Sequence, residues 1–238
     1  MGILETAGST FFLYIAVRHF QAPALVKGLI AAGGAFGQVL TPVTVGVVYR
    51  GGWRACRAAA AMALLGALAL GVASFSTSLG AYAAFVILAM ALCNALVPLI
   101  TQVYQDNYPE RERGMRFSNT VVVRVSAGAL FGWLAGRGLE HDLGRFPWLL
   151  GVYALSLTAS SYALFRCPSR ALARSGERGF FEGMKYLKSD RLFRITLISW
   201  MLLGFGNLMM MPLRIELLAA PRYGLMLQAG SVALLTTI

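Results

Sequence analysis

The sequence predicts an all-α membrane protein, in which several apolar helices form a polytopic bundle. Of its 238 residues, 58% are hydrophobic and only 13% are charged, whereas ordinary globular domains are about 45–50% apolar and about 25% charged. The mean hydropathy is +0.66, and a soluble chain of this composition would expose larger apolar patches than soluble monomers carry. The same composition excludes a disordered chain and a small disulfide scaffold. We therefore expect the chain to lie in a lipid bilayer.

Eight apolar stretches, separated by polar breaks, are the candidate membrane helices. They cover residues 1–17, 25–49, 55–75, 81–104, 117–136, 147–165, 192–213 and 225–238. A helix needs about 20 apolar residues to cross a membrane, so the first and the last stretch are short. We interpret the sequence as a fragment that begins inside one helix and ends inside another.

Lysine and arginine are distributed unevenly among the breaks, and this predicts the orientation. The breaks near residues 50–57, 111–116 and 166–194 contain fourteen of the 21 basic residues, whereas the alternate breaks contain six. Basic residues collect in cytoplasmic loops. We therefore expect these three breaks and the N-terminus in the cytoplasm. The same rule accounts for the net charge of +11 without a nucleic-acid partner.

The longest basic break divides the chain into unequal parts. We expect a six-helix N-terminal bundle over residues 1–166 with a truncated first helix, a cytoplasmic linker over 167–191, and the start of a truncated C-terminal bundle over 192–238. In the linker, the apolar spacing in GFFEGMKYLKSDR indicates an amphipathic helix on the inner membrane surface. A solvated linker helix fits the same residues.

The three cysteines, Cys56, Cys93 and Cys167, lie far apart in the sequence and have no metal-ligand spacing. We expect them to be buried as small hydrophobic residues. The sequence predicts no metal site and no cofactor.

Two ionisable residues stand out inside predicted membrane helices, where a charge is costly and marks a functional candidate. Arg124 is followed at steps of four by Gly128, Gly132 and Gly136, so the four residues share one helical stripe. The glycines predict a packing seam that turns Arg124 inward. Glu5 lies at a similar depth, roughly 20 Å below the outer surface. We expect Glu5 and Arg124 to face each other across a cavity, where they bind solute or exchange a proton; a static ion pair between two helices is the alternative.

Four amides are further candidates for contact with a solute. They are Gln38, Asn94, Gln102 and Asn207. Amides in membrane helices also hold neighbouring helices together, so both roles stay open for each. Arg214 and Glu216, at the outer end of the 192–213 helix, are predicted to pair on the surface.

Three short segments add to this arrangement of helices: GVVYRGGWR (46–54), YPERERGMRFS (108–118) and GFGNLMMMPLRIELL (204–218). Together with the arrangement, these segments resemble the major facilitator superfamily of transporters. Ala-Pro followed by Gly-Leu also precedes both the second and the eighth helix, as expected of two parallel repeats. The resemblance implies a bundle whose first, second, fourth, fifth and seventh helices line a central cavity, and these helices contain the ionisable and amide candidates.

The resemblance also makes the break after the second helix a cytoplasmic gate loop. Its candidate residues are Gly46, Arg50 and Arg54. Arg50 stands where the family has an aspartate that helps to lock the gate, so that role is not transferred to it.

The function that these observations favour is secondary active transport of a small solute by alternating access, with proton coupling left open. A non-transporting membrane scaffold or sensor on the same fold is the alternative. An intramembrane enzyme has less support, because His19 and His141 fall in predicted outer breaks and no catalytic motif is present. We predict a multi-pass protein of the cell membrane that is not an enzyme and has no catalytic residues. The oligomeric state is left open, with a monomer favoured. The substrate is not identified.

Overall fold

The computed structural model describes residues 9–141, 143–169, 187–219 and 231–232, and every element in these ranges is a helix. The elements are α1 (Ser9–Arg18), α2 (Ala24–Ala31), α3 (Gly33–Arg50), α4 (Ala55–Ser74), α5 (Leu79–Ala95), α6 (Val97–Asn107), α7 (Glu110–His141), the 3-10 turn η2 (Leu143–Arg145), α8 (Phe146–Arg166) and α10 (Arg191–Ala219). The all-helical fold predicted from the sequence is therefore confirmed for this part of the chain.

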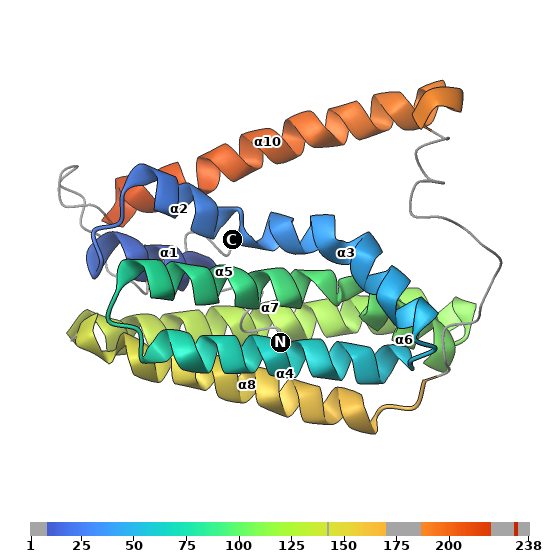
Figure 1. Ribbon diagram of the computed structural model, residues 1–238, viewed down its shortest axis with the longest axis horizontal. Coiled ribbons are helices and arrows are strands. Elements are labelled where there is room, and N and C mark those ends of the chain that lie inside the picture. The colour runs from blue at the N-terminus through green and yellow to red at the C-terminus, as the bar shows by residue number, and fades with distance from the viewer. Residues whose placement is uncertain (1–8, 142, 170–186, 220–230, 233–238) are drawn as a thin grey trace.

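Successive helices run up and down the bundle (Figure 1). The short connections near residues 51–54 and 108–109, and the segment after α8, lie at one end. The connections near 19–23 and 75–78 lie at the other end. This alternation places the described parts of the three predicted cytoplasmic breaks at one end, which we call the linker end. We call the other end the far end.

Within the part of the chain that the structure describes, five helices are long and apolar enough to cross a membrane. They cover Ala55–Ser74, Leu79–Asn107, Glu110–Leu139, Phe146–Arg166 and Arg191–Leu218. A sixth candidate is the pair α2 and α3, which together match the predicted stretch 25–49 but meet at an angle of 45°. These helices are typical of a membrane-embedded protein.

The largest difference from a predicted boundary is at the start of the fifth stretch. The fifth stretch was expected at 117–136, but α7 extends over 32 residues from Glu110 to His141. The charged segment ERERGMR therefore forms the first turns of a helix and not a loop, because it contains good helix formers and has acidic residues in its first turn, where the helix dipole favours them.

Glycines bring α3 into close contact with α5. A Cβ atom on Gly37 would collide with the backbone carbonyl of Ala91 and lie 2.8 Å from the Cβ atom of Asn94. One turn earlier, a Cβ atom on Gly33 would lie 3.2 Å from the sulfur of Met90. The two glycines form a Gly-x-x-x-Gly pair, the spacing that lets membrane helices approach closely.

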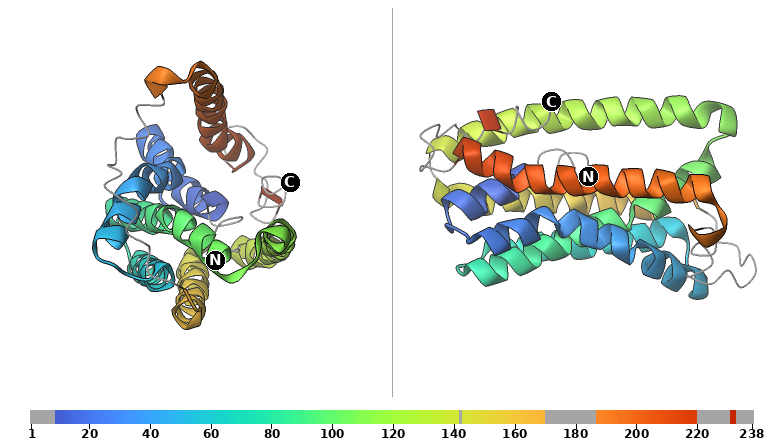
Figure 2. Two further views of the ribbon diagram at one scale, coloured as in Figure 1. Left: turned by 90° about the vertical axis from the view of Figure 1, so that its right-hand side faces the viewer. Right: turned by 90° about the horizontal axis from the view of Figure 1, so that it is seen from above.

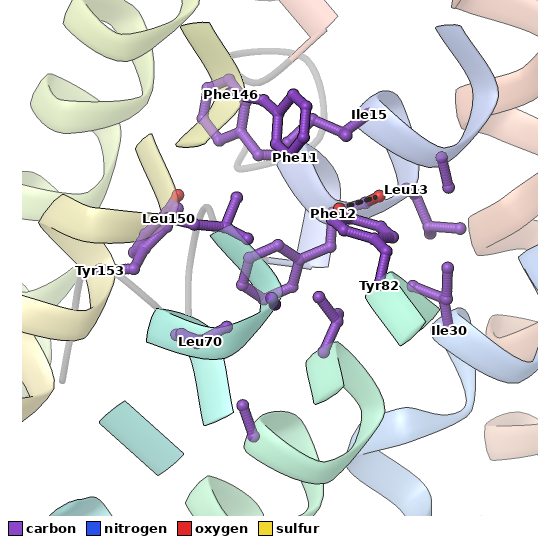
Figure 3. Packing of buried hydrophobic residues seen from close by; sticks show 14 of the residues in the cluster. Phe11, Phe12, Leu13, Ile15, Ile30, Leu70, Tyr82, Phe146, Leu150 and Tyr153 are labelled. Atoms are coloured by element: carbon purple, nitrogen blue, oxygen red, sulfur yellow. Dashed lines mark hydrogen bonds between the residues drawn. The ribbon is translucent and has the colours of Figure 1, made fainter. Parts of the chain in front are cut away.

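Aromatic side chains from several helices form the main core around α1 (Figure 3). Phe12 is fully buried, and its ring lies edge-on to that of Tyr153 on α8, with centroids 5.6 Å apart. Tyr82 on α5 donates a hydrogen bond of 3.0 Å from its hydroxyl to the carbonyl oxygen of Phe12. The described part of α1 is therefore a central helix of the bundle, held by α5 and α8.

Small residues pack α4 against α8. The buried face of α4 consists mainly of alanines, including Ala59 and Ala63, which allow the two helices to approach closely. The hydroxyl of Ser161 on α8 donates a buried hydrogen bond of 2.7 Å to the carbonyl oxygen of Ala60. Figure 1 shows the two helices side by side at the edge of the bundle opposite α10.

Candidate functional site

An ion pair joins α10 to the helices that precede the linker. Lys27 on α2 lies with its Nζ atom 2.8 Å from a carboxylate oxygen of Glu216 on α10. The two side chains are only 11% and 13% exposed. Both residues lie at the far end of the bundle, where α10 reaches α1 and α2.

This ion pair corrects one prediction and reveals residues that the sequence reasoning missed. Glu216 was expected to pair with Arg214 on the surface. Instead Glu216 is largely buried against Lys27, while Arg214 is exposed, so that prediction is wrong. Lys27 was counted only as an outer basic residue. The signal was its position in the apolar segment ALVKGLIA, since a charge inside an apolar helix marks a candidate site.

Apolar packing supports the ion pair at the same place. Ile215 is 1% exposed and belongs to the core cluster, and Met211 and Leu218 pack against that cluster. These residues lie in the last three turns of α10. The far end of α10 is therefore anchored in the core formed by the earlier helices.

The rest of α10 is exposed within the described structure. Trp200 is 69% exposed and Leu203 is 71% exposed. Figure 1 shows α10 converging on α2 at one end of the bundle and separating from α3 toward the other. The end-on view in Figure 2 places α10 outside the layer formed by α2 and α3. Among the described residues, α10 therefore packs against the bundle chiefly at the far end.

Arg124 lies on α7 and is half-buried. Gly128, Gly132 and Gly136, one to three turns further along, are all buried. Glu5, the predicted partner of Arg124, lies outside the described residues. Their pairing therefore stays a prediction.

Two of the amide candidates hydrogen-bond within their own helix. Asn94 donates a hydrogen bond of 2.9 Å to the carbonyl oxygen of Met90, and its side chain also lies against the glycines of α3. Gln102 donates 3.0 Å to a carboxylate oxygen of Asp106. For Asn94 this geometry favours a role in packing α3 against α5.

The other two amide candidates, Gln38 on α3 and Asn207 on α10, are exposed. They lie on the two helices that separate toward the linker end (Figure 1). Both roles predicted for these two amides therefore stay open.

The gate-loop candidates surround a tight turn between α3 and α4. Arg50 is the last residue of α3, and Arg54 caps the start of α4 with its backbone. Gly52 has a φ of +62°, a left-handed conformation that glycine adopts without strain. Gly46 lies in α3, and a Cβ atom there would meet nothing within 4 Å. Gly52, which the sequence reasoning did not single out, is the residue that the turn requires.

Arg113 joins α6 to α7 at the linker end. Its guanidinium donates hydrogen bonds of 2.8 Å to the carbonyl oxygen of Tyr108 and 2.9 Å to that of Gln105. These carbonyls lie at the end of α6, where a helix has unsatisfied acceptors and a negative dipole end. Arg113 therefore stabilises the turn between two predicted membrane helices.

No match to this chain is found among known protein families, curated proteins or solved structures. Among the described residues, no group of three or more His, Cys, Asp or Glu side chains could hold a metal ion. The fold and composition define the class of a membrane-embedded helical bundle. The contact between α10 and the earlier helices combines an ion pair with apolar packing. This contact is the feature from which a function can be inferred.

Proposed function

We propose that this protein is a secondary active carrier that moves a small solute across a membrane by alternating access. The proposal is supported chiefly by the contact between Lys27 and Glu216. It joins the helices before the basic linker to the first helix after it, and it does so at one end of the bundle.

The arrangement of α10 corresponds to one end state of such a carrier. In alternating access, two helical bundles rock about a central site. Contact at the far end together with separation at the linker end is the geometry expected when the far side is closed. In the opposite state, Lys27 and Glu216 would separate and the exposed part of α10 would pack toward α3.

The ion pair is suited to a contact that opens and closes. Two charges that are almost removed from water attract each other strongly, but their desolvation offsets much of that attraction. The net preference for the closed contact is therefore small enough for a solute to reverse. Apolar burial of Ile215 alone would not give the contact this dependence on charge.

The proposal is tested first by transport. The full-length protein, reconstituted in proteoliposomes, should take up at least one of a panel of labelled amino acids, sugar acids and organic cations above the level of empty liposomes. Uptake measured with and without a pH gradient then determines whether protons are coupled. Absence of uptake for every solute, with or without the gradient, would contradict the proposal.

Distances between spin labels test the mechanism without knowledge of the solute. One pair of labels replaces Val47 on α3 and Ile195 on α10, and the other replaces Leu25 on α2 and Leu217 on α10; all four residues are exposed. The labels are placed in a variant whose native cysteines are serines. We expect Lys27→Gln to lengthen the distance between the labels at Leu25 and Leu217. The distance between the labels at Val47 and Ile195 should become shorter. If neither distance changes, a rigid scaffold on the same fold is favoured.

A further inference from the structure

Three segments meet at the linker end of the bundle, at the point where the chain leaves α8. The backbone N–H of Cys56, in the first turn of α4, donates a hydrogen bond of 3.2 Å to the hydroxyl oxygen of Ser169. The amide of Asn107, the last residue of α6, donates 2.9 Å to the carbonyl oxygen of Pro168. The residues that follow α8 are therefore held by α4 and α6.

Two thiols lie together at this junction. The sulfur of Cys56 is 3.8 Å from the carbonyl oxygen of Pro168, and the sulfur of Cys167 is 3.9 Å from the same oxygen. Both cysteines belong to a small packed cluster with Ala55 and Val103. Residues separated by more than one hundred positions are thus brought into contact by the fold.

The third cysteine is remote from this pair. Cys93 lies on α5 against Gly66, in the middle of α4. Gly66 is ten residues along α4 from Cys56, which corresponds to roughly 15 Å at the helical rise of 1.5 Å per residue. Cys93 is therefore a control for any reaction assigned to the other two.

We propose that Cys56 and Cys167 form a redox-active dithiol, which exchanges with a small-molecule disulfide such as oxidised glutathione and closes into an intramolecular disulfide. This goes beyond the transport function and does not depend on it. The pair is reduced at rest, because the linker end is the predicted cytoplasmic end and the cytoplasm keeps thiols reduced. Oxidation would then tie the start of the linker covalently to α4.

The two cysteines have different roles in the exchange. Cys167 is half-buried, whereas Cys56 is only 1% exposed, so Cys167 is the thiol that an external disulfide reaches. Its thiolate attacks one sulfur of glutathione disulfide and releases one glutathione, which leaves a mixed disulfide on Cys167. The Cys56 thiolate then attacks the Cys167 sulfur and releases the second glutathione. The protein loses two protons and two electrons, and one glutathione disulfide becomes two glutathione molecules.

Burial determines how fast this exchange runs. Burial, together with the neighbouring Cys56 thiol, raises the pKa of the Cys167 thiol above its ordinary value. Since the thiolate is the nucleophile, the exchange is slow at neutral pH and accelerates as the pH rises. The pair therefore resists brief oxidation and responds to sustained oxidising conditions.

The experiment treats the folded full-length protein with oxidised glutathione in detergent, and intact mass spectrometry follows the products. The wild type should lose the mass of two hydrogen atoms, and after denaturation only one thiol should react with N-ethylmaleimide. Cys56→Ser should stop at one glutathione attached to Cys167. Cys167→Ser should remain reduced, and Cys93→Ser should form the disulfide as the wild type does.

Three results would overturn the proposal. The first is a wild type that keeps three reactive thiols after prolonged oxidation at raised pH. The second is a Cys167→Ser variant that oxidises as fast as the wild type. The third is a disulfide that peptide mapping assigns to Cys93. The melting temperature of each serine variant is measured before oxidation, so that an unfolded variant is recognised. If a variant is unfolded, the wild-type products still decide whether Cys56 and Cys167 form a disulfide.

Discussion

The Nζ atom of Lys27 lies 2.8 Å from the carboxylate of Glu216. In the sequence, Lys27 belongs to a helix before the basic linker and Glu216 to a helix after it. Both side chains are nearly buried, so each charge depends on the other for much of the stabilisation that water would otherwise give it. The contact is the polar part of an interface whose apolar part is Ile215. This interface joins the helices before the basic linker to the helix after it.

Removal of one partner of this ion pair should destabilise the protein. Lys27→Gln takes away the cation next to a mostly buried carboxylate, and we expect a loss of about 1–3 kcal/mol, between the values for exposed and buried pairs. The change is measured by thermal unfolding in detergent. Lys188→Gln, which alters an exposed lysine, should change stability by less than about 0.5 kcal/mol. Equal effects of the two variants would contradict the assignment.

The double variant Lys27→Gln/Glu216→Gln isolates the interaction between the partners. Because the second substitution removes the carboxylate that the first one leaves behind, we expect the double variant to lose less stability than the sum of the two single losses. Additive losses in the same unfolding assay would mean that the two charges act independently.

The close packing of α3 against α5 at Gly37 leaves no room for a side chain. Gly37→Ala puts a methyl group onto the backbone of α5 at Ala91, so α3 and α5 must separate; we expect a loss of about 1–3 kcal/mol, as for other overpacked cores. The matched control is Gly71→Ala on α4, where a Cβ atom would meet nothing within 4 Å. The control should be neutral or stabilising by up to about 1 kcal/mol, since alanine is the better helix former. Both are compared by thermal unfolding.

Arg113 should stabilise the turn between α6 and α7. Arg113→Gln removes two hydrogen bonds to carbonyl oxygens, and because the side chain is partly exposed we expect a loss of about 1 kcal/mol. Amide hydrogen exchange should increase locally around Tyr108. Arg111→Gln, a substitution of an exposed arginine on the same turn of α7, should leave exchange there unchanged. A uniform increase over the whole bundle would argue against a local role.

The thiol of Cys167 should react slowly at neutral pH. Burial and then Cys56 raise its pKa, so the protonated form predominates to a higher pH than in an unfolded chain. Alkylation by iodoacetamide requires the thiolate, and its rate should therefore rise with pH only above the range in which a free cysteine reacts. In Cys56→Ala the rate profile should move to lower pH, because one cause of the shift is removed. An identical profile in urea-unfolded protein would contradict this prediction.

For the described residues, the sequence was sufficient to predict the membrane-length helices but not all their ends. Apolar length located the membrane-length helices, because hydrocarbon requires about 20 apolar residues whatever the tertiary contacts. The start of α7 was missed, because charged helix formers before Phe117 resemble a loop when only hydropathy is considered. The 45° break between α2 and α3 occurs near Gly33. The spacing of Gly33 and Gly37 was present in the sequence, but only the contact with α5 reveals its use.

The contacts between distant segments could not be predicted from one sequence. The pairing of Lys27 with Glu216 depends on where α10 meets α2, and no local pattern specifies that meeting. The same holds for Cys56 and Cys167, whose separation in the sequence argued against any relation between them. Asn94, in contrast, was assigned two possible roles from its type and position, and its contact with Gly37 favours packing.

Arg124 gives the most direct test of a solute site. It is a half-buried arginine inside a membrane-length helix, and the next three residues on its stripe are buried glycines. We expect Arg124→Gln to reduce transport at least about tenfold, equivalent to about 1.4 kcal/mol, with a smaller change in melting temperature. The control is Arg137→Gln, which replaces an exposed arginine that stacks on Trp133 at 4.0 Å. This variant should transport normally. The exchange Glu5→Arg/Arg124→Glu distinguishes the two roles, because a static ion pair would survive the reversal and restore uptake, whereas a residue that binds the solute requires its own charge; we expect uptake to stay low.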